Sequence, residues 1–266
     1  MTPAELYKAG KLSEAVAAAT AAVKGKPTDI GARGLLAELL SFSDDFTRAD
    51  KQLEALLQMD PKVVMGVMLF RQIVHGAQAR QDFYTQGRVP EFLQPPGEEL
   101  QLRLKASIAI REGDMAGAGA LLAEADTLLK PIGGTCDGVP FDDIRDLDDL
   151  TASVFEVITS TGKFYWIPMS QVEAIEFHAP ERPRDLLWRR ARMVVRGGPD
   201  GEVFLPSLYA GSAAAEDENI RLGRATDWQG DDGQPIRGLG QRCLLVGEVD
   251  KPIIEIETIE FNEPAS

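Results

Sequence analysis

Residues 6–27, LYKAGKLSEAVAAATAAVKGKP, have a counterpart 34 positions later in residues 40–61, LSFSDDFTRADKQLEALLQMDP. Each copy opens on leucine, carries a small alanine near its middle and closes on proline. Small alanines let two helices approach closely, and a helix rarely continues through proline. The pattern predicts two packed helix pairs that turn at Gly10 and at Asp44. We expect the Asp44 turn to differ in shape, because aspartate is less free than glycine.

The first half of the chain resembles the tetratricopeptide repeat. A 34-residue period with glycine at the turn, alanine in the second helix and a closing proline is typical of that repeat. A third copy is visible around Gly113, Ala118 and Pro131, so residues 62–97 should hold a divergent unit with a long helix over 62–86. Stacked helix pairs bury a common core and offer a groove to peptides or helices.

The groove is predicted to accept an amphipathic helix. Repeat domains that clamp a C-terminal carboxylate commonly use asparagine and lysine, and the first 218 residues contain no asparagine. Most residues of a repeat serve packing alone, so each candidate for the groove could equally be a packing residue. By repeat phase the groove candidates are Tyr7, Glu38, Phe42, Arg71 and Arg103.

Charge divides the chain near its middle. The 266 residues include 28 basic and 42 acidic ones, for a net charge of −14, and residues 1–131 hold 15 of the bases and 17 of the acids. Nucleic-acid binding is disfavoured, because phosphates need a positive field. No apolar run approaches the ~18 residues of a membrane span, and the N-terminus lacks a signal-peptide pattern. We expect a cytoplasmic protein with domains at residues 1–131 and 132–266.

Residues 132–266 are predicted to be β-rich. Short apolar runs between turn residues indicate strands, and a change of apolar phase at Thr258 predicts a bulge or a strand end. One helix is expected between Asp146 and Thr159 from the spacing of its leucines and valines. The fold class is α+β multidomain, with helical repeats before a curved sheet or partly open barrel. The expected strands are Lys163–Met169, Val172–His178, Arg192–Arg196, Glu202–Leu205, Cys243–Val249 and Ile254–Phe261, with a turn at residues 250–252.

The sequence contains no standard enzymatic or metal-binding pattern. The densest acidic cluster, residues 142–149, does not have the spacing of a calcium loop, and acids at a helix N-terminus explain it better. The two histidines and two cysteines are too scattered for a zinc set. Phosphate-loop, serine-elbow and dinucleotide signatures are missing. We predict a non-enzymatic protein with no cofactor, and the alternative is a metal-dependent enzyme that uses Asp142, Asp146 and Asp149.

Tryptophan, arginine and aspartate gather at residues 185–190, DLLWRR, and at residues 221–228, RLGRATDW. Arginine–aspartate pairs fix loops and tryptophan fills the space beneath them, so these segments would hold an irregular domain together. Tryptophan and arginine are also the usual anchors of protein interfaces. Both interpretations stay open.

These segments belong to a longer series that resembles the ImpE family, also called TagJ or SciE-type proteins. The series opens with DGVPFDDIRDLDD at residues 137–149 and continues through YWIP at 165–168, FLPSLY at 204–209 and GQR at 240–242. The residues that carry the resemblance are Asp137, Arg145, Asp149, Trp166, Asp185, Trp188, Arg221, Arg224, Asp227, Trp228 and Arg242.

The resemblance implies an accessory component of the bacterial type VI secretion system, a contractile sheath recycled by an AAA+ unfoldase. Members of the family are described as non-enzymatic adaptors that bind the N-terminal helix of the small sheath subunit. The resemblance supplies no catalytic residues. The expected partners are therefore the small sheath subunit and the unfoldase. The alternative is a generic repeat scaffold for another cytoplasmic partner.

Overall fold

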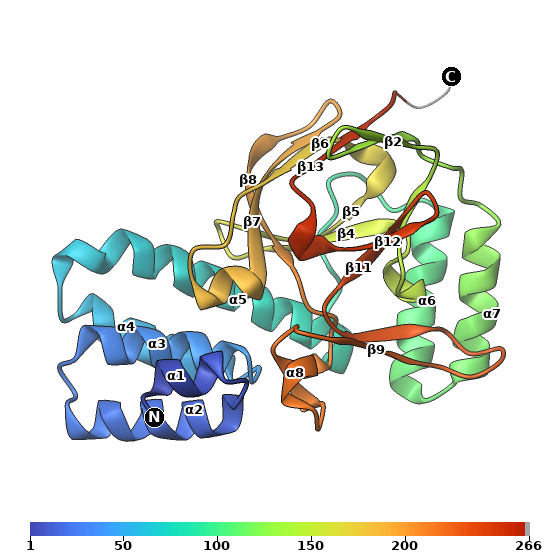
Figure 1. Ribbon diagram of the computed structural model, residues 1–266. Coiled ribbons are helices and arrows are strands. Elements are labelled where there is room, and N and C mark those ends of the chain that lie inside the picture. The colour runs from blue at the N-terminus through green and yellow to red at the C-terminus, as the bar shows by residue number, and fades with distance from the viewer. Residues whose placement is uncertain (264–266) are drawn as a thin grey trace.

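The computed structural model describes residues 1–263 (Figure 1). Helices occupy the N-terminal part, and strands begin about eight residues after the last of them. Their bounds are α1 (Pro3–Lys8), α2 (Leu12–Gly25), α3 (Ile30–Ser41), α4 (Phe46–Leu57), α5 (Val64–Gln86), α6 (Glu98–Glu112) and α7 (Met115–Asp126).

The turns between paired helices share one backbone conformation. Gly10, between α1 and α2, has φ +80°, and Gly113, between α6 and α7, has φ +83°. Asp44, between α3 and α4, has φ +52° and is therefore also left-handed. The expectation of a differently shaped turn at Asp44 is wrong: the register of the helix pair imposes a positive φ on a residue that rarely adopts it.

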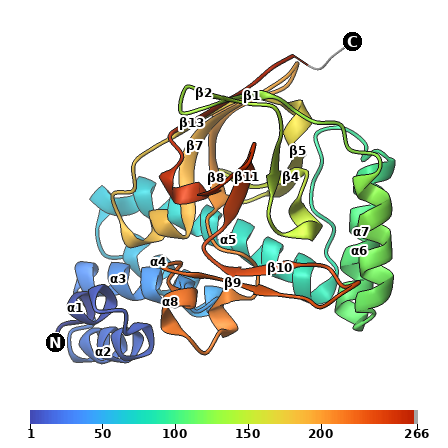
Figure 2. The same ribbon diagram turned by 45° about the vertical axis from the view of Figure 1, so that its right-hand side comes forward.

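The third helix pair does not continue the stack of the first two. The predicted long helix is confirmed as α5, which ends at a left-handed Gly87 (φ +78°). It leaves α3 and α4, runs below the sheet, and delivers α6 and α7 to the opposite side of the molecule (Figures 1 and 2). The repeats therefore form two separate groups of helices instead of one continuous groove.

The C-terminal half is built on an open antiparallel sheet, as the predicted fold class requires. Its strands follow the order β2-β1-β13-β6-β7-β8-β4-β5. A second sheet has the order β12-β11-β3, and β9 and β10 form a separate hairpin. The bounds are β1 (Gly134–Cys136), β2 (Val139–Phe141), β3 (Ile144–Asp146), β4 (Val154–Thr159), β5 (Phe164–Pro168), β6 (Val172–Phe177), β7 (Trp188–Val195), β8 (Asp200–Pro206), β9 (Thr226–Gln229), β10 (Arg237–Gly240), β11 (Cys243–Val246), β12 (Val249–Pro252) and β13 (Thr258–Phe261), with the short helix α8 (Glu218–Arg221).

The helix predicted between Asp146 and Thr159 is wrong. The segment holds the end of β3, a 3-10 turn at Asp149–Thr151 and β4. Residues 154–158 are all buried, because the sheet is covered on both faces here. A strand buried on both faces reads as a continuous apolar run, and periodicity does not distinguish it from a buried helix.

Two further differences concern turns in the last strands. The turn expected at residues 250–252 is strand β12, and the chain reverses earlier, at Gly247 (φ +59°). The strand expected from Ile254 begins only at Thr258, after a 3-10 turn at Ile253–Glu255. Thr258 is therefore the start of β13, and the predicted bulge or strand end there is not found, because residues 254–257 do not form a strand.

The apolar core crosses the boundary expected at residue 131. One cluster of buried side chains joins α1–α7 to Val154, Ile158 and Trp166 on one face of the sheet. A second cluster lies on the other face, where Phe155 and Val157 meet the strands β6, β7, β11 and β13. Alternate residues of β4 thereby serve two cores, and the helices and the sheet are packed as one body.

Close packing of α5 on β4 predicts opposite effects for two glycines of the same helix. A methyl group at Gly76 would overlap Cγ2 of the buried Ile158, whereas nothing lies within 4 Å of a methyl group at Gly66. Gly76→Ala should destabilise the protein by ~1–3 kcal/mol through overpacking. Gly66→Ala should stabilise it by up to ~1 kcal/mol through helix propensity. Thermal denaturation of both variants tests this, and equal shifts of one sign would contradict the packing described.

Candidate functional site

Five of the eleven residues that carry the ImpE resemblance lie at the junction between the repeat helices and the sheet: Trp166, Trp188, Arg221, Arg224 and Arg242. Arg221 of α8 donates to the hydroxyls of Ser13 (3.0 Å), in the first turn of α2, and Ser43 (3.4 Å), between α3 and α4. Arg224 donates to the backbone carbonyls of Tyr7 (2.9 Å) and Lys8 (3.2 Å). These arginines fasten the first repeats to the C-terminal half.

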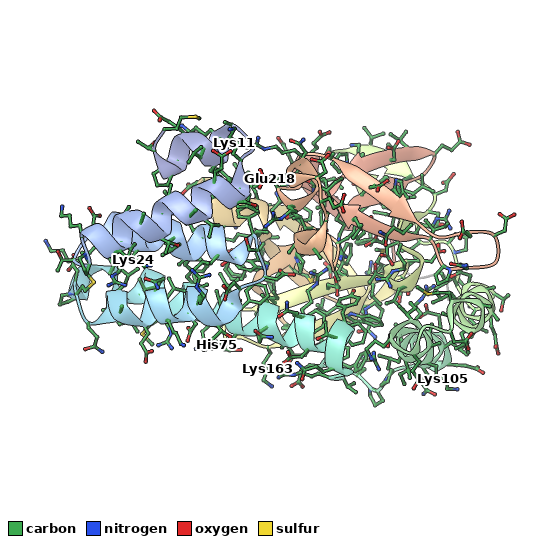
Figure 3. All side chains as sticks on the ribbon, turned by 90° about the horizontal axis from the view of Figure 1, so that it is seen from below. Lys11, Lys24, His75, Lys105, Lys163 and Glu218 are labelled. Carbon is green, nitrogen blue, oxygen red and sulfur yellow. The ribbon has the colours of Figure 1, made fainter. Side chains whose placement is uncertain are left out.

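Glu218 completes this contact. Helix α2 has no capping side chain of its own at Lys11. The Glu218 carboxylate instead accepts a hydrogen bond from the backbone N–H of Ser13 (2.7 Å), in the first turn of α2. A negative charge at this end of a helix is stabilised by the helix dipole. Figure 3 shows Glu218 beside Lys11, where α8 meets the start of α2.

Two tryptophans of the motifs are packed against repeat helices. Trp188, at the start of β7, lies 6.2 Å from the ring centres of Phe46 in α4 and Phe70 in α5. Trp166 in β5 is fully buried and meets the ring of Phe83 edge-on at 4.9 Å. Both rings therefore act as apolar contacts between the halves, with the geometry that aromatic pairs prefer.

A buried ionic network crosses the same junction. Arg80 of α5 donates to Glu156 of β4 (2.7 and 2.9 Å), and Tyr84 donates to its other carboxylate oxygen (2.8 Å). Arg242, which precedes β11, also donates to Glu156 and reaches Asp146 at 3.0 Å. Glu156 is thus a buried carboxylate whose Oε2 accepts hydrogen bonds from two guanidinium groups, one on α5 and one just before β11.

The electrostatics of Glu156 follow from this arrangement. Burial by itself raises the pKa of a carboxyl group, but Arg80 and Arg242 outweigh it and hold the pKa of Glu156 at about 2. The two carboxylates raise the pKa of Arg242 above its ordinary value, against the effect of burial. Glu156 and Arg242 therefore stay charged at neutral pH.

The acidic cluster does not lie at a helix N-terminus, and that interpretation is corrected. Asp146 ends a strand and accepts bonds from Arg242, Tyr209 and Thr151, while Asp148 binds Arg237 (2.8 and 2.9 Å) and caps a 3-10 turn. Within residues 1–263, no three histidine, cysteine, aspartate or glutamate side chains come together as a metal site. Asp142 is exposed.

The remaining motif residues lie outside the network. Asp149 accepts from the backbone N–H of Ile236 (2.6 Å). Asp185 accepts from backbone N–H groups of its own loop. Asp137 accepts from the backbone N–H groups of Glu257 and Thr258 at the start of β13, and pairs with Lys251 at 3.1 Å. Arg145 is exposed on β3, and Trp228 is partly exposed beside Tyr209.

The five groove candidates do not share one surface. Tyr7 stacks near Phe42, and the guanidinium of Arg224 lies over the Tyr7 ring. Phe42 is buried, and Glu38 faces Arg184 and Arg182 of the C-terminal half. Arg71 forms a two-pronged pair with Asp50 (2.7 and 2.9 Å) on the outer side of α4 and α5.

Arg103, the fifth candidate, is buried inside the protein and does not face a groove. Its side chain is fully buried in α6. It binds Glu99, Asp126 of α7 (2.6 Å) and the backbone carbonyl of Asp149. The guanidinium thereby joins the last helix pair to the loop before β4.

A cavity of about 1000 Å³ lies at the junction. Its wall includes Phe46 of α4, Arg80 and Tyr84 of α5, Tyr209 after β8 and Arg237 of β10. Asp44 and Asp227 contribute carboxylates to the same wall. Polar groups on an apolar and aromatic wall are typical of a binding pocket.

Sequence reasoning missed the centre of the network. Glu156 interrupts the apolar run VFEVI of residues 154–158, and a charge inside a buried strand signals a buried partner. Arg80 carries no local signal, because its partner lies 76 residues away. Among residues 1–263, no helix is long and apolar enough to cross a membrane.

Removing the central carboxylate should be far more costly than removing an exposed one. Glu156→Gln leaves two buried arginines short of a partner and should lower the free energy of unfolding by ~3–5 kcal/mol. Glu202→Gln in β8, whose partners Arg190 and His178 are exposed, should cost at most ~1 kcal/mol. Chemical denaturation of both variants measures the difference, and similar losses would contradict the network.

The pH dependence of stability should carry the same signature. The pKa of Glu156 is about 2 in the folded protein, whereas a glutamate in the unfolded chain has a pKa of 4.5. A lowered carboxyl pKa stabilises the fold fully above pH 4.5, and this stabilisation, ~3 kcal/mol, is lost as pH falls towards 2. The wild-type protein should therefore lose more stability between pH 5 and 2 than Glu156→Gln loses. Parallel pH profiles would exclude this role.

Comparisons with known proteins agree with the geometry. Residues 138–260 match the ImpE protein family, and residues 6–64 match a tetratricopeptide repeat. The chain is 28% identical over 261 residues to the type VI secretion system accessory component TagJ of Pseudomonas aeruginosa, covering 98% of this chain and 91% of the relative. The X-ray crystal structure of a Vibrio parahaemolyticus protein is similar, with a TM-score of 0.91, 27% identity and 98% coverage of both chains. These matches confirm the resemblance that the motifs indicated: the chain belongs to the ImpE family, with its ImpE domain at residues 138–260.

Proposed function

We propose that this protein is a non-enzymatic adaptor of a type VI secretion system in the bacterial cytoplasm. It binds the N-terminal helix of the small contractile-sheath subunit and modulates sheath assembly or recycling by the AAA+ unfoldase. Support comes from the accessory role in the name of the Pseudomonas relative and from the helix-binding tendency of tetratricopeptide repeats. The enzymatic alternative requires carboxylates that can hold a metal ion. Two of its three, Asp146 and Asp149, already accept hydrogen bonds from protein donors, which argues against that alternative.

The helix-binding surface that we propose is the outer face of α4 and the first half of α5, defined by Met65, Met68, Arg71 and His75. In a continuous repeat array the next helix would cover this face, but α5 runs on below the sheet and α6 leaves to the other side. Met65 is 86% exposed and Met68 is 53% exposed. Adjacent exposed methionines suit a helix-accepting surface, because their flexible side chains adapt to different partners.

The polar side chains on this face already have ion-pair partners within the protein before another protein binds. Arg71 is paired with Asp50, and His75 approaches the same carboxylate at 3.4 Å. Figure 3 shows His75 at the surface of α5, close to the turn between β4 and β5 that holds Lys163. The paired charges form a polar rim next to the methionines, and an apolar patch with a polar rim is the usual anatomy of a protein interface.

The opposite side of the first repeats is a less favourable place for the sheath helix. There Arg221 and Arg224 bind Ser13 and the carbonyl of Tyr7, and Trp188 covers Phe46. A partner helix on that side would have to displace these buried contacts of the C-terminal half. The outer face of α4 and α5 requires no such displacement.

Calorimetric titration of the full-length protein with a synthetic peptide tests the proposal. The peptide is the N-terminal amphipathic helix of the small sheath subunit from the same secretion system. We expect a micromolar Kd that weakens at least about tenfold in the double variant Met65→Lys with Met68→Lys, as for anchor residues of an interface. Replacing Arg71 with alanine should weaken binding less, because its charge is already paired.

The matched control is the double variant Val139→Lys with Val249→Lys, which adds the same charge at two exposed apolar positions of the sheet domain. It should bind the peptide like the wild type. Equal losses in both double variants would show a general charge effect and remove the α4–α5 face from the proposal. If the folded wild-type protein does not bind the peptide, the sheath-helix function is wrong and a scaffold for another partner remains.

A further inference from the structure

Asp44 is an unusual residue for its position. The equivalent turns between α1 and α2 and between α6 and α7 carry glycine, and Asp44 is one of two non-glycine residues with positive φ within residues 1–263. Its side chain is partly buried, and within residues 1–263 its carboxylate takes part in no hydrogen bond. Burial raises the pKa of Asp44 to about 6, although the charge of Arg80 counteracts it. Glycine would suit the backbone better and would avoid the partial desolvation of a carboxylate, so Asp44 lowers stability, and no contact that it makes compensates for this.

The cavity at the junction offers a reason for an aspartate at position 44. Asp44 lines it together with Asp227 and Glu216. The only donor that Asp227 binds is the N–H of the next residue (2.9 Å), and no donor from residues 1–263 binds the Glu216 carboxylate. Three acidic residues therefore line one space of about 1000 Å³, of which Asp227 and Glu216 are also exposed to solvent and Asp44 is partly buried.

The two arginines on the same wall are already engaged. Arg80 donates to Glu156 and to the carbonyl of Leu208 (3.1 Å). Arg237 is held by both oxygens of Asp148. Neither guanidinium donates a hydrogen bond to Asp44, although the charge of Arg80 acts on it, and the wall carries more acidic residues than arginines.

We propose that this cavity is a second binding site, which takes a lysine or arginine side chain from a segment of a partner polypeptide. The cationic group would pair with Asp44, and its aliphatic stem would lie against the apolar and aromatic wall formed by Leu208, Trp188 and Tyr209. The volume is that of a site for several peptide residues. This site is separate from the α4–α5 face and does not depend on the sheath-helix proposal.

Two-dimensional NMR of the full-length protein tests the proposal with the probe peptide acetyl-Ala-Ala-Lys-Ala-Ala-amide. The readout is the indole signal of Trp188, which lines the cavity, compared with that of Trp166, which is not part of its wall. The lysine peptide, or its arginine analogue, should shift the Trp188 signal with a Kd in the millimolar range. The analogue with norleucine in place of lysine keeps the stem without the charge and should leave the signal unmoved.

Asp44→Asn and Asp44→Gly remove the charge but suit a left-handed turn. Each should weaken peptide binding about tenfold, as expected from the loss of a charge-assisted hydrogen bond. Each should also raise Tm by about 2–4 °C, because a partly desolvated carboxylate without a hydrogen-bond partner is gone. The control Asp232→Asn changes the net charge equally at an exposed position outside the cavity and should not affect binding.

Three results would overturn the proposal. The first is the absence of a Trp188 shift with either cationic peptide, and the second is equal binding of the norleucine analogue. The third is unchanged binding in both Asp44 variants, or equal weakening by Asp232→Asn, which would reveal attraction to the net charge alone. Binding of the sheath-derived peptide should be the same in wild type and Asp44→Asn, so that failure of one proposal is distinguishable from failure of the other.

Discussion

The position of the sheet relative to the helices depends on one buried carboxylate. Glu156 lies in the middle of β4, between two apolar cores, where an unpaired charge would cost several kcal/mol. It is tolerated because Arg80 approaches from α5 and Arg242 from the chain before β11. Three segments that are distant in sequence must therefore meet at one point. Apolar packing alone would allow α5 to slide along the sheet, whereas hydrogen-bonded charge pairs specify one register.

The family motifs gain a common physical meaning from this arrangement. Arg221 and Arg224 hold the first helix pair, Trp188 covers α4 and α5, and Arg242 reaches the network around Glu156. Most of these residues therefore join one part of the molecule to another. The interpretation of tryptophan and arginine as internal fasteners agrees with these contacts, although what they fasten is the repeat helices to the ImpE domain.

The repeats were predictable from sequence because their signals are local. The 34-residue period, the capping box at Thr2 (with Glu5 N–H to Thr2 Oγ1 at 3.3 Å) and the length of α5 all depend on residues within a few turns of each other. Residues 144–159 were misread because burial on both faces removes the alternation that marks a strand. The route of α5 below the sheet was also beyond sequence reasoning. It is fixed by partners such as Arg80 and Glu156, and no local pattern connects residues 76 positions apart.

The capping of α2 by Glu218 has a consequence for how the chain acquires its structure during synthesis. The donor and the acceptor of this bond are 205 residues apart, and the bonds from Arg221 and Arg224 span similar distances. The N-terminal helices leave the ribosome first, yet the surface against which they finally pack is formed by almost the last part of the chain to emerge. Domains that emerge early ordinarily fold early. Here the first helix pair can form by itself on the ribosome, but it reaches its final position only after most of the ImpE domain has been translated.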